Sequence, residues 1–60
     1  MSQVYNPEAE RMAQIERLEL DARSIRRRIE HVTSDQDRRV LNKQLHEIEE
    51  QIANLQAGLP

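Results

Sequence analysis

Apolar residues recur at steps of three and four along two stretches of the chain. The first stretch holds Ile15, Leu18, Ala22, Ile25, Ile29 and Val32. The second stretch holds Leu41, Leu45, Ile48, Ile52, Leu55 and Leu59. This spacing is that of the a and d positions of a heptad repeat, which gather the apolar side chains on one side of a helix. Because apolar and polar residues nowhere alternate as in a strand, the sequence predicts an all-α fold.

The two stretches do not belong to one straight helix. An unbroken first stretch would require apolar residues at four positions that are polar, namely Gln36, Arg39, Lys43 and His46. The segment 32–37 between them is the part of the chain densest in short polar residues. We therefore predict a first helix over about 7–32, a turn at about 32–35 and a second helix over about 35–57, with an extension at 1–6 and a cap and tail at 58–60.

The numbering of the two stretches predicts how the helices pair. Facing residues of an antiparallel pair have numbers with a constant sum, and here that sum is 70. It pairs Ile15 with Leu55, Leu18 with Ile52, Ala22 with Ile48, Ile25 with Leu45 and Ile29 with Leu41, each an a position with a d position. The next layer sets Val32 against Arg38, where we expect the core to end. The pattern thus predicts an antiparallel coiled-coil hairpin.

Residues at the predicted helix ends have the types that cap helices. Asn6 and Pro7 suit the N-cap and the first position of a helix. Gly58 suits a glycine C-cap, with Leu59 contacting the last turn and Pro60 ending the helix.

The turn offers three alternative N-caps for the second helix, which are Thr33, Ser34 and Asp35. Thr33 with Gln36 has the spacing of a capping box.

Length and composition imply that the hairpin has a partner. A chain of 60 residues without cysteine has no disulfide to support it, and a core of this size rarely supplies more than about 3–5 kcal/mol. Two hairpins can stack their apolar faces into a four-helix bundle, so we expect a homodimer; the alternative is a different protein that supplies the other half. Three apolar residues lie outside the a and d positions, namely Met12, Leu20 and Val40. They belong either to a further buried surface or to the single exposed apolar residues that are common on proteins.

Candidate chemistry is sparse. No cysteine nucleophile or glycine-rich phosphate loop is present, and the serines lack a surrounding oxyanion loop. His46 and Glu50 are four residues apart and suit a shared surface ion or, more simply, a solvated helix face. We expect no enzyme activity, no cofactor and no metal site. The absence of cysteine and of a long apolar run predicts a cytoplasmic protein that does not enter membranes.

Charge is unevenly distributed although nine basic and eleven acidic residues leave a net charge of −2. Residues 21–43 hold seven basic and four acidic residues, a net of +3, whereas the rest of the chain holds two and seven, a net of −5. One interpretation is a set of solvated faces with an ion pair between Arg26 and Glu49. The other is a partner-binding surface for an acidic protein or nucleic acid, formed by Arg23, Arg27, Arg28, Arg39 and Lys43.

These features favour a non-enzymatic protein-interaction or oligomerisation module, a small adaptor or regulator. The heptad pattern and hairpin length resemble the layout of the Rop regulators of plasmid copy number, dimers of helical hairpins that bind paired RNA loops, which implies a nucleic-acid-binding alternative. Asp35 and Asp37 at the tip are similar to the tip acids of transcript-cleavage factors, coiled-coil hairpins that enter RNA polymerase. Both resemblances concern layout, and acids are also favoured at any helix N-terminus.

Overall fold

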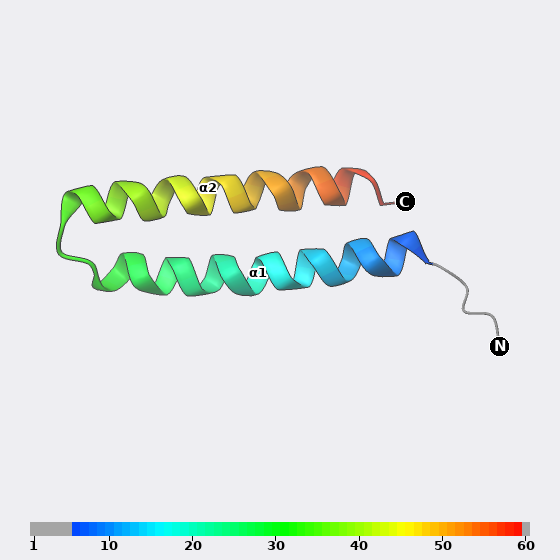
Figure 1. Cartoon of the computed structure of the whole chain (residues 1–60), viewed down its shortest axis with the longest axis horizontal. Helices are drawn as coiled ribbons and strands as arrows, with labels where there is room; N and C mark the ends of the chain where they lie inside the picture. The colour runs from blue at the N-terminus through cyan, green and yellow to red at the C-terminus, as the bar shows by residue number, and fades with distance from the viewer. Residues whose placement is uncertain (1–5, 60) are drawn as a thin grey trace.

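The computed structural model describes residues 6–59 and consists there of two helices and a short link. Helix α1 spans Pro7–His31 and helix α2 spans Asp35–Ala57. The helices lie side by side and run in opposite directions, so the start of α1 and the end of α2 are at the same end of the hairpin (Figure 1). The described residues contain no strand. The prediction of an all-α antiparallel hairpin is confirmed.

Helix α1 begins as its sequence predicts. The Asn6 side-chain oxygen accepts hydrogen bonds from the backbone N–H groups of Glu8 and Ala9, at 3.1 and 3.2 Å. Pro7 occupies the first helical position, where the missing N–H costs nothing. Glu8 and Glu10 place negative charge at the positive end of the helix dipole. The expected extension at 1–5 lies outside the described residues.

The link turns the chain through extended backbone rather than through glycine. Val32 has φ −76° and ψ 143°, and its N–H donates to the carbonyl of Arg28 at 3.0 Å. Ser34 is the N-cap of α2, since its hydroxyl accepts from the N–H of Asp37 at 3.4 Å. The structure thus selects Ser34 among the three predicted caps. Thr33 stands one residue before the cap and does not begin the helix.

Helix α2 ends at the predicted glycine but with a different backbone geometry. Gly58 has φ −87° and ψ −3°, in the right-handed region, so the left-handed freedom of glycine is not used. The N–H groups of Gly58 and Leu59 donate to the carbonyls of Leu55 and Gln56 at 3.2 and 3.1 Å. A side chain at position 58 would begin 2.7 Å from the Arg11 guanidinium. Glycine therefore provides room for a side chain of α1, and Pro60 lies outside the described residues.

The core is a single line of side chains between the helices. Only Ile15 and Ala22 are buried among the described residues, with exposed fractions of 7% and 2%. Every half-buried residue also continues the predicted heptad spacing, and these are Leu18, Ile25, Ile29, Val32, Arg38, Leu41, Leu45, Ile48, Ile52, Leu55 and Leu59. The shortest extent of the molecule is 12 Å, the thickness of one helix. The hairpin is thus one layer thick, and no second layer covers its core.

An arginine closes this line at each end of the hairpin. Arg38 follows the heptad spacing beyond Leu41, and its Nη2 donates to the carbonyl of Val32 at 3.2 Å. Arg11 precedes Ile15 by one heptad step, and its Nη1 donates to the carbonyl of Gly58. Both guanidinium groups therefore bind carbonyls that a helix end leaves without an intrahelical partner. The Val32–Arg38 layer lies where the register predicts.

Candidate interaction surface

One face of the hairpin carries three open hollows in a line. With Ile15 at an a position, the d residues are Leu18, Ile25 and Val32 in α1 and Leu41, Ile48 and Leu55 in α2. Each hollow is lined by one d residue from each helix: Val32 with Leu41, Ile25 with Ile48, and Leu18 with Leu55. All six side chains are half-buried. We call this surface the d-face groove.

The rims of the d-face groove are formed by positions that follow d around each helix on the side away from the helix contact, which are g, then c, and Arg27 at an f position. Five rim residues are neutral and polar, namely Gln14, Ser24, Gln44, Gln51 and Asn54. Five are charged, namely Arg17, Asp21, Arg27, Arg28 and Asp37. An apolar floor with a polar rim is typical of contact with another protein.

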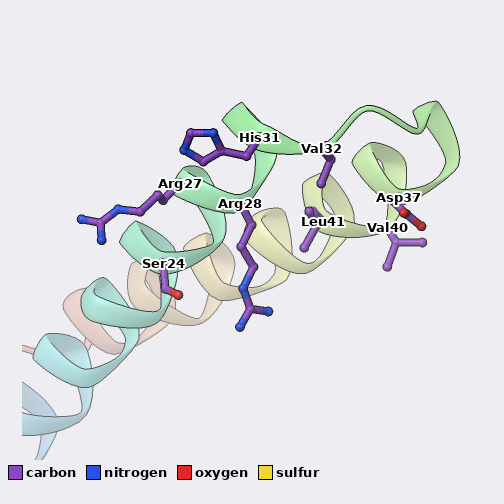
Figure 2. Close-up of a pocket in the computed structure, with 8 residues that line it drawn as sticks. All are labelled: Ser24, Arg27, Arg28, His31, Val32, Asp37, Val40 and Leu41. Atoms are coloured by element: carbon purple, nitrogen blue, oxygen red, sulfur yellow. The ribbon is translucent and has the colours of Figure 1, made fainter.

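The hollow nearest the turn combines apolar and basic side chains. Figure 2 shows Val32 and Leu41 between the two helices, with Val40 beside them on α2. Arg28 extends along the groove, whereas Arg27 points away from the helix pair (Figure 2). The groove is therefore apolar at its floor here and basic at its α1 rim.

The opposite face of the hairpin is joined by an ion pair. Arg26 Nη2 lies 3.0 Å from Glu49 Oε2, and both residues occupy e positions, which are next to the a positions. Their side chains are about half exposed, so the pair contributes on the order of 0.2–1 kcal/mol. The predicted Arg26–Glu49 contact is present. The interhelical ion pair thus spans the a-side face and leaves the d-face groove open.

The structure places the predicted heptad residues between the helices but does not bring the five predicted basic residues into one patch. Arg23 and Arg39 occupy b positions and Arg27 and Lys43 occupy f positions, on the outer faces of the two helices. Arg28 occupies a g position, and it lines the hollow nearest the turn together with Arg27, whereas the other three line none of the hollows. All five are exposed. The division follows from the heptad positions, since b and f point away from the partner helix while g borders it.

The three apolar residues off the heptad spacing have different surroundings. Met12, Leu20 and Val40 are 55%, 61% and 50% exposed. Val40 lines the d-face groove, whereas Leu20 occupies an f position on the outer face of α1 and Met12 an e position. Only Val40 of the three therefore extends the groove.

The polar side chains that the sequence offers for metal or tip-acid chemistry, His46, Glu50 and Asp35, are exposed. His46 Nε2 is 3.4 Å from Glu50 Oε1, as their spacing of four predicts. Asp35 at the tip accepts a hydrogen bond from Arg38 Nη1 at 3.2 Å, and its side chain is 85% exposed. Within residues 6–59, no group of three or more histidine, aspartate or glutamate side chains is placed to hold a metal ion.

Sequence reasoning missed the part that Arg11 plays and the position of the groove. The signal for Arg11 is its distance of four residues from Ile15, which continues the heptad spacing with a charged residue. The groove had no such signal, because the spacing does not say which side of the apolar line stays open.

Neither described helix has the run of apolar residues that crossing a bilayer requires. Comparison of the chain with protein-family models, with curated proteins and with solved structures finds no match.

Proposed function

We propose that the chain is a non-enzymatic interaction and oligomerisation module that binds helices of a partner in its d-face groove. The observation that carries this proposal is the line of six half-buried apolar side chains with open hollows between them. Two further helices laid on this face would complete a four-helix bundle, in which a and d residues form the interior. In this role the protein is a small adaptor or regulator.

The energetics of the hairpin support the same proposal. Two buried residues are far too few to offset the ordering of about 50 residues, which costs on the order of 1.5 kcal/mol each. Covering a half-buried leucine or isoleucine contributes about 25 cal/mol for each Å² of apolar surface removed from water. A partner on the d-face groove would therefore stabilise the hairpin as well as bind to it.

The test uses two exposed apolar residues that differ in location. Val40→Asp places a charge in the groove without altering an a or d residue. We therefore expect this variant to stay monomeric when its mass is measured by light scattering. Leu20→Asp is the matched control, since the same charge on the outer face of α1 would leave the assembled mass unchanged. Far-ultraviolet circular dichroism at high concentration reports helicity for both. Equal masses for the two variants would contradict the proposal.

Nucleic-acid binding is the alternative function, and the division of the basic residues makes it weaker. The basic residues of the outer faces form two separate i,i+4 pairs, one of Arg23 and Arg27 on α1 and one of Arg39 and Lys43 on α2. These pairs do not join into one continuous basic stripe along the described hairpin. Titration with duplex RNA and DNA tests this alternative. Binding through phosphates would weaken steeply as salt is added, with a slope set by the number of phosphates contacted.

A further inference from the structure

The partner of the d-face groove can be identified more closely, on the premise of the function proposed above. We infer that a second copy of this chain occupies the groove, packed face to face with the two turns at opposite ends. A twofold axis through the layer of Ile25 and Ile48 relates the two copies. Two properties of the groove lead to this arrangement, its symmetric floor and the charges at its g positions, and its area limits the strength of the dimer.

The floor of the groove has the same spacing in both directions from its middle. Leu18 and Val32 lie seven residues before and after Ile25, and Leu41 and Leu55 lie seven residues before and after Ile48. A twofold axis at the middle layer sets each d residue of one copy against a d residue of the other. Leu18 would meet Val32 of the second copy, and Val32 would meet Leu18. Such reciprocal contacts are what a symmetric dimer interface requires.

Charge at the g positions distinguishes the two ways of stacking such faces. In the middle hollow these positions hold Asp21 and Arg28 on α1 but Gln44 on α2. With the turns at opposite ends, α1 of one copy lies over α1 of the other; with the turns at one end, α1 lies over α2. Only the first arrangement can bring Asp21 of one copy to Arg28 of the other, so these charges favour opposite ends.

The positions of Asp21 and Arg28 along α1 fit the twofold axis at Ile25. Asp21 lies four residues before Ile25 and Arg28 three residues after it, both at g positions that line the middle hollow. The twofold axis brings Asp21 of each copy next to Arg28 of the other, giving two equivalent ion pairs. On α2, Gln44 and Gln51 have the same relation to Ile48, so their amides would meet as well.

The area of the face limits how strong the dimer can be. Helices of 25 and 23 residues form a face about 35 Å long and about 20 Å wide, or roughly 700 Å². The axis at Ile25 and Ile48 overlaps residues 19–31 of α1 and 39–57 of α2 with their copies, so roughly two thirds of this face is covered. A standard protein–protein interface covers about 800 Å² on each partner, and this dimer is therefore expected at the small end of that range.

The experiment is a charge-swap series measured by light scattering and sedimentation. We expect a dimer of about 14 kDa, twice the chain mass of 7.1 kDa. Asp21→Arg and Arg28→Asp should each weaken dimerisation about tenfold through two like-charge contacts. The double variant should restore it. Because residues 21 and 28 are about 10 Å apart along one helix, this rescue has to act between copies.

Arg23→Asp is the matched control for Arg28→Asp. It makes the same change on α1 at an exposed b position that lines none of the three hollows, so we expect the dimer to persist.

Three outcomes would overturn the inference. A double variant that stays as weakly dimeric as the single variants would exclude the Asp21–Arg28 contact between copies, and with it the arrangement with turns at opposite ends. A chain that folds only with a different protein in the groove would exclude the second copy while leaving the proposed function intact. A folded monomer with an unoccupied groove at high concentration would overturn both.

Discussion

At the scale of single residues, the ends of the helices depend on a few polar side chains. Ser34 and Asn6 cap the two helix starts, and Arg38 and Arg11 bind the carbonyls at the two ends of the apolar line. The residue types of the caps follow from the sequence. The choice of Ser34 over Thr33 does not, because either hydroxyl can cap a helix and the path of the link decides which one does.

Arg38 provides a prediction at this scale. Its guanidinium joins the tip of the hairpin through Val32 and Asp35, and net contributions of such bonds are about 1–2 kcal/mol. We expect Arg38→Ala to lower the free energy of unfolding by about that amount in urea titrations followed by circular dichroism. Arg39→Ala, an exposed neighbour at a b position, is the control and should change stability by less than about 0.5 kcal/mol. Equal losses would show that Arg38 acts only as a solvated charge.

At the scale of elements, two helices pair along a line whose most buried residue is Ala22. Its exposed fraction of 2% is the lowest in the core, which indicates that α1 and α2 approach closely there. The heptad spacing predicts that Ala22 faces α2. The close approach is a property of the pair, because it also depends on the residues opposite.

Ala22→Leu tests that close approach. Three added carbon atoms would push the helices apart or force strained rotamers, and such overpacking typically costs about 1–3 kcal/mol. We expect a lower midpoint of thermal unfolding than for the unsubstituted chain. Ala13→Leu is the control, since position 13 is exposed on the same helix and leucine is nearly as good a helix former as alanine. An unchanged midpoint for Ala22→Leu would mean that the helices do not meet closely at this layer.

At the scale of the whole molecule, the hairpin is one layer thick and most residues of its apolar line are only half-buried. A structure of this kind is expected to draw stability from association, so its unfolding should depend on protein concentration.

This dependence gives a further prediction. Raising the chain concentration from about 1 to 100 μM should stabilise an associating hairpin by about 2.7 kcal/mol per mole of dimer, which is RT ln 100. The midpoint of thermal unfolding, measured by circular dichroism, should rise by several degrees accordingly. Val40→Asp should remove the concentration dependence, whereas Leu20→Asp should keep it. A midpoint independent of concentration would show that the hairpin is stable alone.

The sequence by itself determined the helices, their antiparallel pairing and the residues along the contact line. It could do so because the period of an α-helix converts linear spacing directly into a face, and because Asn6, Pro7 and the polar link mark where the helices begin and end. Even the final layer of Val32 and Arg38 followed from the numbering.

Only the tertiary structure decided which side of that line stays open. Spacing places a and d residues toward the partner helix but leaves the rotation of each helix about its own axis undefined. That rotation depends on contacts between distant residues, such as the Arg26–Glu49 pair across the a-side face and the burial of Ile15 and Ala22. The d-face groove, and with it the function proposed here, arises from those contacts.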